Sequence, residues 1–235
     1  MNKQQIQSLF DKHFKSIGSY FTSKITTNQI KQDIYHCPND IYEYVYGCIS
    51  NTKNIRYGYF LEDVINFFLF ENGATLNKND QTSNIDLVFE MNNTIYIGEI
   101  KIRDNHDSTK KHGQIQNLMS KVTNYSSSYS NIVVLLYFID PSQNKNYNFY
   151  KNELNKLQDH LNLKDAKVLY GDQLFEYLNL SKQWCTLKQQ IVEFNHEIVS
   201  NNYINSLIFE HITTTDDLVK KIDQRILKIL KYRQD

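Results

Sequence analysis

Three charged side chains, Asp86, Glu99 and Lys101, lie within two short runs that are otherwise rich in Val, Ile, Phe and Tyr. The dipeptide Asn92-Asn93 separates the two runs, and asparagine tolerates the positive φ angles of a tight hairpin turn. If these two asparagines form the loop, Asp86 lies directly opposite Glu99. Lys101 then shares their face, because side chains alternate along a strand. The sequence therefore predicts a β-hairpin that gathers the three side chains on one face.

Two opposed carboxylates repel each other, because their Cβ atoms are only about 4.5–5.5 Å apart. A hard divalent cation such as Mg²⁺ would offset this repulsion, since proteins hold it with one or two carboxylates together with phosphate oxygens and water. A neighbouring lysine suits a phosphate or an attacking water. The alternative is that Glu99 and Lys101 form a simple salt bridge while Asp86 marks a strand end. Removal of Lys101 would then destabilise the fold rather than abolish a reaction.

The hairpin itself predicts a covered sheet. Val88 and Ile97 share the face of Asp86 and Glu99, and the opposite face is also largely apolar. That opposite face carries Ile85, Leu87, Phe89, Tyr96, Gly98, Ile100 and Ile102. Strands that are apolar on both faces are typical of sheets with helices on both sides.

A helix expected over residues 56–71, after a break at residues 51–54, precedes the hairpin and contributes a fourth candidate. Glu62 lies in line with Gly58, Ile65 and Leu69 on this largely apolar helix. A carboxylate in such a place is costly unless it is paired or close to a metal. We therefore include Glu62 in the candidate site, the alternative being that it reaches solvent through a gap. The helix should end near Asn72-Gly73.

A loop dense in hydrogen-bond donors follows Lys101. Lys110, Lys111 and His112 could contact phosphates, whereas amide side chains could contact base edges. The candidate DNA-contact residues are Arg103, Asn105, His106, Lys110, Lys111, His112 and Gln114. A charged loop is often merely solvated, and its position directly after Lys101 is what distinguishes this one.

The remaining elements follow from periodicity. Helical spacing marks residues 4–22, 115–122 and 150–161, and apolar runs mark strands at 132–139 and 166–170. Asp172 is expected to cap the helix that begins near Leu174. Further amphipathic helices are expected from Pro38, over 184–198 and 203–208, and over 218–230. We expect a single domain over 1–235, with a helical N-terminal extension at 1–55, a core at 56–180 and a helical C-terminal extension at 181–235.

Composition sets broader bounds. The 235 residues carry 26 basic and 26 acidic side chains, so a nucleic-acid partner would have to be recognised by local patches rather than by net charge. Cys37, Cys48 and Cys185 are widely spaced and form no C-x-x-C pair, which disfavours zinc. The start of the chain is polar, and the longest apolar run is far shorter than the roughly 20 residues of a membrane span. These features are typical of a cytoplasmic protein with reduced cysteines.

The order of elements and charged residues resembles the PD-(D/E)XK nuclease superfamily, and within it the type II restriction endonucleases. The resemblance rests on Asn84-Ile85-Asp86 and Glu99-Ile100-Lys101, separated by the hairpin, and it extends over roughly residues 56–180. The segment Arg56-x-Gly58-x-x-x-Glu62 is similar to the first core helix of that family. Ile85 stands where the motif often has proline, which leaves the carboxylate in place.

This resemblance implies an α/β fold with a mixed central sheet flanked by helices. It also implies Mg²⁺-dependent hydrolysis of double-stranded DNA at specific sites by a homodimer. Asp86, Glu99 and the Ile100 carbonyl would hold the metal, and Lys101 and Glu62 would assist the reaction. A repair or junction-resolving nuclease of the same fold, or a non-catalytic DNA-binding protein, remains an alternative at this point.

Overall fold

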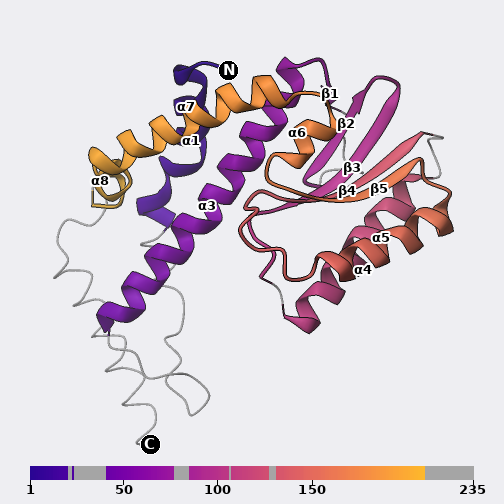
Figure 1. Cartoon of the computed structure of the whole chain (residues 1–235). Helices are drawn as coiled ribbons and strands as arrows, with labels where there is room; N and C mark the ends of the chain where they lie inside the picture. Colours follow the sequence, from indigo (N-terminus) through magenta and orange to yellow (C-terminus); the bar gives the residue numbers. More distant parts are fainter. Residues whose placement is uncertain (21–22, 24–40, 77–84, 106, 127–130, 210–235) are drawn as a thin grey trace, which may run out of the picture. The chain divides into compact units, whose positions relative to one another are not determined.

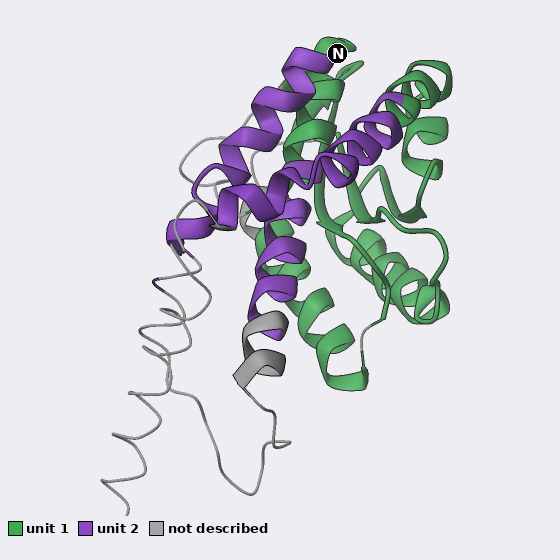
Figure 2. Cartoon of the chain, turned by 90° about the vertical axis from the view of Figure 1, so that its left-hand side faces the viewer, with its two compact units in different colours: residues 1, 62–189 green, residues 2–61, 190–235 purple. Residues whose placement is uncertain are grey.

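The computed structural model describes residues 1–20, 23, 41–76, 85–105, 107–126 and 131–209. The chain forms two compact units, one of Met1 and Glu62–Gln189 and one of Asn2–Leu61 and Gln190–Asp235, coloured green and purple in Figure 2. His106, the helix start expected at Pro38 and the helix expected over 218–230 lie outside the described residues.

A five-stranded mixed sheet forms the centre of the first unit. Its strands are β1 (Thr75–Leu76), β2 (Leu87–Met91), β3 (Thr94–Lys101), β4 (Ile132–Phe138) and β5 (Asp165–Tyr170), and they lie in that order across the sheet. β1, β2 and β3 are antiparallel neighbours, whereas β3, β4 and β5 are parallel. Helices flank this sheet (Figure 1), which confirms the predicted fold class.

The β2–β3 hairpin has the predicted register. Met91 pairs with Thr94 and Leu87 pairs with Gly98, so the loop consists of Asn92 and Asn93. Their φ angles are 52° and 57°, as expected of a tight turn that matches the twist of the strands. The ladder ends at Leu87, one residue after Asp86.

Gly98 brings β3 unusually close to β4. A Cβ atom at this position would lie 2.6 Å from the carbonyl oxygen of Leu135. Only glycine lets the two backbones approach so closely beside Glu99.

The face of the sheet that carries Glu99 packs against α4 (Ser108–Ser126) and α5 (Tyr147–Leu161), which lie on the same side of the sheet in Figure 1. Buried side chains such as Val88, Ile97, Leu118 and Leu154 fill this layer. On the other face, the ring of Phe175 stacks on Trp184, and Phe68 meets both rings edge-on. The hairpin is therefore covered on both faces, as its apolar composition predicts.

The helix before the hairpin is longer than expected. α3 runs from Ile41–Glu71 without interruption, so the break predicted at residues 51–54 is wrong. Thr52 is buried in this segment, and the Lys53 ammonium donates to Asn205 at 2.7 Å. Tertiary contacts thus outweigh the small helix penalty of such residues, about 0.7 kcal/mol each at most. The predicted end is confirmed, since Gly73 follows with a φ of 92°.

The expected cap of α6 (Gln173–Tyr177) is also corrected. The Asp172 side chain makes no capping hydrogen bond. Its carboxylate instead accepts Nε1 of Trp184 at 2.7 Å and Nζ of Lys188 at 2.6 Å. The Asp172 side chain therefore connects the start of α6 to α7 (Ser181–Ser200) and does not cap α6.

The second unit is helical where it is described. α1 (Lys3–Phe14) begins with an Asn2 capping box, and the last part of α7 and α8 (Tyr203–Phe209) belong to the same unit. Its core is aromatic: Phe10 stacks on Phe14 and meets Phe60 and Phe194 edge-on. No helix among the described residues is long and apolar enough to cross a membrane.

Candidate active site

The structure brings Asp86, Glu99 and Lys101 together. Nζ of Lys101 lies 3.1 Å from Oδ2 of Asp86 and 3.0 Å from Oε2 of Glu99. The two carboxylates therefore converge on one point beside the hairpin. The candidate catalytic residues that the register predicts are thus neighbours in space.

Asp86 is held in place by the backbone of β3. Its Oδ2 also accepts the N–H of Ile100 at 3.0 Å. The carbonyl of the next residue, Lys101, accepts the N–H of Ile139 on the β4 side. Successive carbonyls of a strand point to opposite edges, so the Ile100 carbonyl points to the edge where Asp86 lies. This arrangement suits the predicted role of that carbonyl as a third oxygen ligand.

Glu99 is almost entirely buried, with only 2% of its side chain exposed, and a second lysine helps to compensate its charge. Lys121 of α4 forms an ion pair with Oε1 of Glu99, while Lys101 contacts Oε2. Buried charges require such partners, because an unpaired buried carboxylate is strongly unfavourable. The cluster holds two negative and two positive charges and is balanced.

Lys121 is the member of the cluster that sequence reasoning missed. It lies between Leu118 and Val122, which are buried against the sheet. The sequence does offer one signal for Lys121, because it lies beside the core face of the helix that follows the Glu-x-Lys motif. Such lysines usually extend to solvent, so spacing alone does not identify this one.

The charges around Lys101 change its acid–base behaviour. Burial alone lowers the pKa of its ammonium, but the charges of Asp86 and Glu99 and their hydrogen bonds outweigh burial and raise that pKa. In this arrangement the side chain is a charged donor at neutral pH. It therefore suits contacts with anionic groups.

The helix that carries Glu62 is linked to the site through Asn66. Asn66 lies one turn after Glu62, and its Nδ2 donates to the carbonyl oxygens of Glu62 at 3.0 Å and Asp86 at 3.3 Å. Glu62 itself is half-buried on α3. Its role in the reaction stays a prediction.

The donor set fits a magnesium ion. Among the described residues, no group of three or more His, Cys, Asp and Glu side chains has the arrangement of a metal site. Mg²⁺ does not need one, because one or two carboxylates complete its shell with water and substrate oxygens. Asp86 and Glu99 supply two converging carboxylates, and the buried Oδ1 of nearby Asn66 has no protein hydrogen-bond partner and suits an ordered water.

The donor-rich loop is anchored by a buried aspartate. Asp104 is fully buried, and its carboxylate accepts hydrogen bonds from the Asn146 backbone, the Asn146 side chain and the Tyr170 hydroxyl at 2.7, 2.7 and 2.9 Å. Burial and the Asp104 hydrogen bond raise the pKa of Tyr170. With Asp104 fixed, its exposed neighbours Arg103 and Asn105 are presented at the surface.

The predicted phosphate-contact residues form a basic and aromatic surface on α4 and α5. The Lys111 ammonium lies 4.6 Å from the centre of the Phe149 ring, and His112 meets the same ring edge-on. Lys110 is exposed beside Asp107. Lys145 and Lys151 are exposed at the start of α5, where Lys151 lies over Tyr147.

Two predicted donors are less free to contact DNA. Arg103 is exposed, but its guanidinium is paired with Asp140 at 3.0 Å. Gln114 is half-buried, and its Nε2 is buried without a hydrogen-bond partner. Lys121 follows Gln114 by seven positions, about two helical turns, which places both on the same face of α4. The DNA-contact roles of these residues stay predictions.

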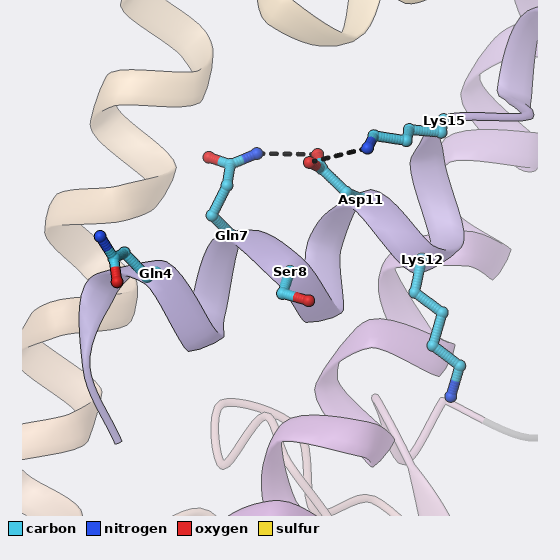
Figure 3. A pocket seen from close by; sticks show the side chains of 6 residues that line it. All are labelled: Gln4, Gln7, Ser8, Asp11, Lys12 and Lys15. Carbon is cyan, nitrogen blue, oxygen red and sulfur yellow. Dashed lines mark hydrogen bonds and ion pairs between the residues drawn. The ribbon is translucent and has the colours of Figure 1, made fainter.

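A surface hollow in the second unit is unrelated to this cluster. Its lining comes from α1 and the residue after it, and Figure 3 shows Asp11 in contact with both Gln7 and Lys15. None of the predicted site residues lines it. The one carboxylate of this polar lining, Asp11, is already paired with Lys15, so the hollow offers no chemistry comparable to that of the hairpin.

Comparison with known protein families points to the same chemistry. Residues 4–195 match the family model described as "HinfI: Type II restriction endonuclease, HinfI". The match covers most of the chain and includes every candidate site residue. No curated protein matches the chain.

Proposed function

Because the chain belongs to the HinfI family of type II restriction endonucleases, we propose that Asp86, Glu99 and Lys101 form its active site and that Mg²⁺ is its metal cofactor. The protein is a site-specific DNA-cleaving enzyme, so the restriction interpretation is confirmed over a repair nuclease or a non-catalytic binding protein. Members of such families typically use a divalent metal ion. The observation that carries the proposed site is the convergence of both carboxylates on Lys101.

Asp86 and Glu99 would hold Mg²⁺ through the oxygens that now face Lys101, with the Ile100 carbonyl as a further ligand. Mg²⁺ bound there supplies Lewis-acid polarisation of the phosphate and activation of a water nucleophile. Glu62, on the helix linked to Asp86 through Asn66, would hold a water bound to the metal.

Lys101 would act on the substrate. Its ammonium lies at the point where both carboxylates meet, and its flexible stem allows it to turn toward a phosphate. There it would orient the attacking water and offset the charge that develops on the phosphate oxygens. Cleavage would leave 5′-phosphate and 3′-hydroxyl ends.

DNA would be held by the exposed donors near the ends of β3 and the starts of α4 and α5. Arg103, Lys110, Lys111 and His112 are assigned to phosphates, and Asn105 and Gln114 to bases or ordered water; His106, outside the described residues, belongs to the same set. We further propose that the enzyme acts in the cytoplasm as a homodimer. Two-fold protein symmetry would then match a palindromic site.

The test is cleavage of unmethylated plasmid and phage DNA with Mg²⁺, beside EDTA and a Lys101→Ala variant. We expect discrete fragments that disappear in both comparisons while the circular dichroism of the variant is unchanged. Lys167→Ala is the matched control, because Lys167 pairs with Asp165 at 3.1 Å on the same sheet. Full activity of Lys101→Ala would contradict the assignment of the site.

A further inference from the structure

The two oxygens of Glu99 have different partners. Oε2 contacts Lys101, which also contacts Asp86, so this oxygen lies on the side of the proposed metal. Oε1 contacts Lys121 from α4. The two oxygens of the Glu99 carboxylate therefore face different lysines, one from β3 and one from α4.

Lys121 is well placed to hold the Glu99 carboxylate in this orientation. Only 17% of its side chain is exposed, against 30% for Lys101. Its helix packs on the sheet through Leu118 and Val122, both fully buried on either side of it in the sequence. A lysine held by such packing keeps one orientation and has little freedom to follow a substrate.

We propose that Lys121 is a positioning residue that holds Oε1 of Glu99, leaves only Oε2 to face Asp86, and thereby sets a preference for Mg²⁺ over Ca²⁺. The inference rests on the proposed function, in which Glu99 is a metal ligand. Mg²⁺ is small and demands near-octahedral geometry, whereas Ca²⁺ accepts more oxygens and carboxylates that bind through both. A Glu99 freed at Oε1 can offer both oxygens, which favours the larger ion.

The selectivity ratio separates this role from simple charge repulsion. Removal of a lysine charge strengthens the binding of any divalent cation, and it does so similarly for Mg²⁺ and Ca²⁺. A change in the ratio of their dissociation constants therefore reports on the arrangement of Glu99. A purely structural role of Lys121 would lower stability without changing this ratio.

The experiment measures the dissociation constants of MgCl₂ and CaCl₂ from the rise of Tm with metal concentration, without DNA. In Lys121→Met we expect the Mg²⁺-to-Ca²⁺ ratio of dissociation constants to rise on the order of tenfold, typical of lost outer-shell contacts. Lys121→Arg keeps the positive charge and should have the wild-type ratio. Lys156→Met is the matched control, since Lys156 of α5 pairs with Glu153 but is 71% exposed.

Equal changes for both ions, or no change, in Lys121→Met would overturn the inference and leave the proposed function intact. If Glu99→Gln leaves both dissociation constants at the wild-type values, the metal assignment itself fails, and this inference fails with it. Should Lys121→Met not fold, Lys121→Gln provides the same test. Its side chain stays polar but is one bond too short to reach Oε1, so the same rise is expected and the same absence of change would overturn the inference.

Discussion

Oδ2 of Asp86 accepts the backbone N–H of Ile100 at 3.0 Å, just beyond the last backbone pair of the hairpin. The side chain thereby replaces the strand partner that Ile100 would otherwise lack. It also fixes the carboxylate next to Lys101 before any metal arrives. Preorganisation of this kind is what makes an electrostatic group effective in catalysis.

Asp86→Asn should abolish most cleavage while keeping the fold. The amide oxygen can still accept the Ile100 N–H, but the charge that would hold the proposed metal is gone. We expect kcat to fall on the order of a hundredfold or more, as when one preorganised group is removed from an active site. Plasmid cleavage and circular dichroism measure the two effects. Asp165→Asn, in β5, is the control, and near-normal cleavage by Asp86→Asn would exclude its role as a ligand.

Gly98→Ala should destabilise the sheet. The added methyl would lie 2.6 Å from the Leu135 carbonyl oxygen, so β3 and β4 must separate. Overpacking of this kind costs about 1–3 kcal/mol, which urea denaturation can measure. Gly113→Ala in α4 is the contrast, because its methyl would meet nothing within 4 Å. It should gain about 0.5–1 kcal/mol from helix propensity, and equal effects at both glycines would refute the steric argument.

Removal of metal by EDTA should stop cleavage without unfolding the protein. Lys101 and Lys121 already offset the charges of Asp86 and Glu99, so neither carboxylate of this cluster is left unpaired. We expect a single cooperative thermal transition with EDTA and an unchanged circular dichroism spectrum. Loss of cooperativity on chelation would instead indicate a structural metal.

Lys188→Met should reveal a stability difference that depends on pH. The hydrogen bond from Lys188, with that from Trp184, lowers the pKa of Asp172. A lowered carboxyl pKa stabilises the folded state above the unfolded value of about 4 and loses this effect as the pH falls through the folded value. The variant should therefore be less stable at pH 7, by under about 1 kcal/mol because the pair is half exposed, and equal to wild type in stronger acid.

Urea midpoints at several pH values would show this convergence. Lys182→Met, at an exposed position of the same helix, controls for the loss of one positive charge. A difference that persists in acid would mean that Lys188 stabilises α7 by packing rather than through Asp172.

Lys110→Ala and Asn105→Ala should weaken DNA binding in different ways. A phosphate contact raises affinity for all sequences alike, so its loss lowers affinity uniformly and reduces the slope of log K against log salt by about 0.9. A base contact instead discriminates between sequences, and its loss should cost about 1–3 kcal/mol at the cognate site. Fluorescence anisotropy with cognate and altered duplexes in Ca²⁺ distinguishes the two. Sequence-dependent loss in Lys110→Ala would reverse these roles.

The hairpin was predictable because its signals are local. Turn residues, strand alternation and the spacing of Asp86, Glu99 and Lys101 together define one register, and the structure has that register. The fold class follows from the order of helical and strand patterns in the same way.

The features that sequence reasoning missed depend on contacts between distant elements. How α4 is rotated against the sheet decides that Lys121 reaches Glu99, and helical spacing does not contain that information. The contact of Lys53 with Asn205 similarly lies in α3 at the place where its polar residues predicted a break. Asp172 is of a residue type that commonly caps helices, but Lys188 and Trp184 offer its carboxylate stronger partners.

The tight Asn92-Asn93 turn also bears on the order in which the candidate active site assembles during folding. Asp86 and Lys101 are separated by only one hairpin, so their meeting closes a short loop and depends on few long-range contacts. Hairpins form within about 1–10 μs, far faster than the assembly of parallel strands from distant segments. The carboxylates can therefore meet before β4 and β5 complete the sheet, and Lys121 joins them only when α4 docks.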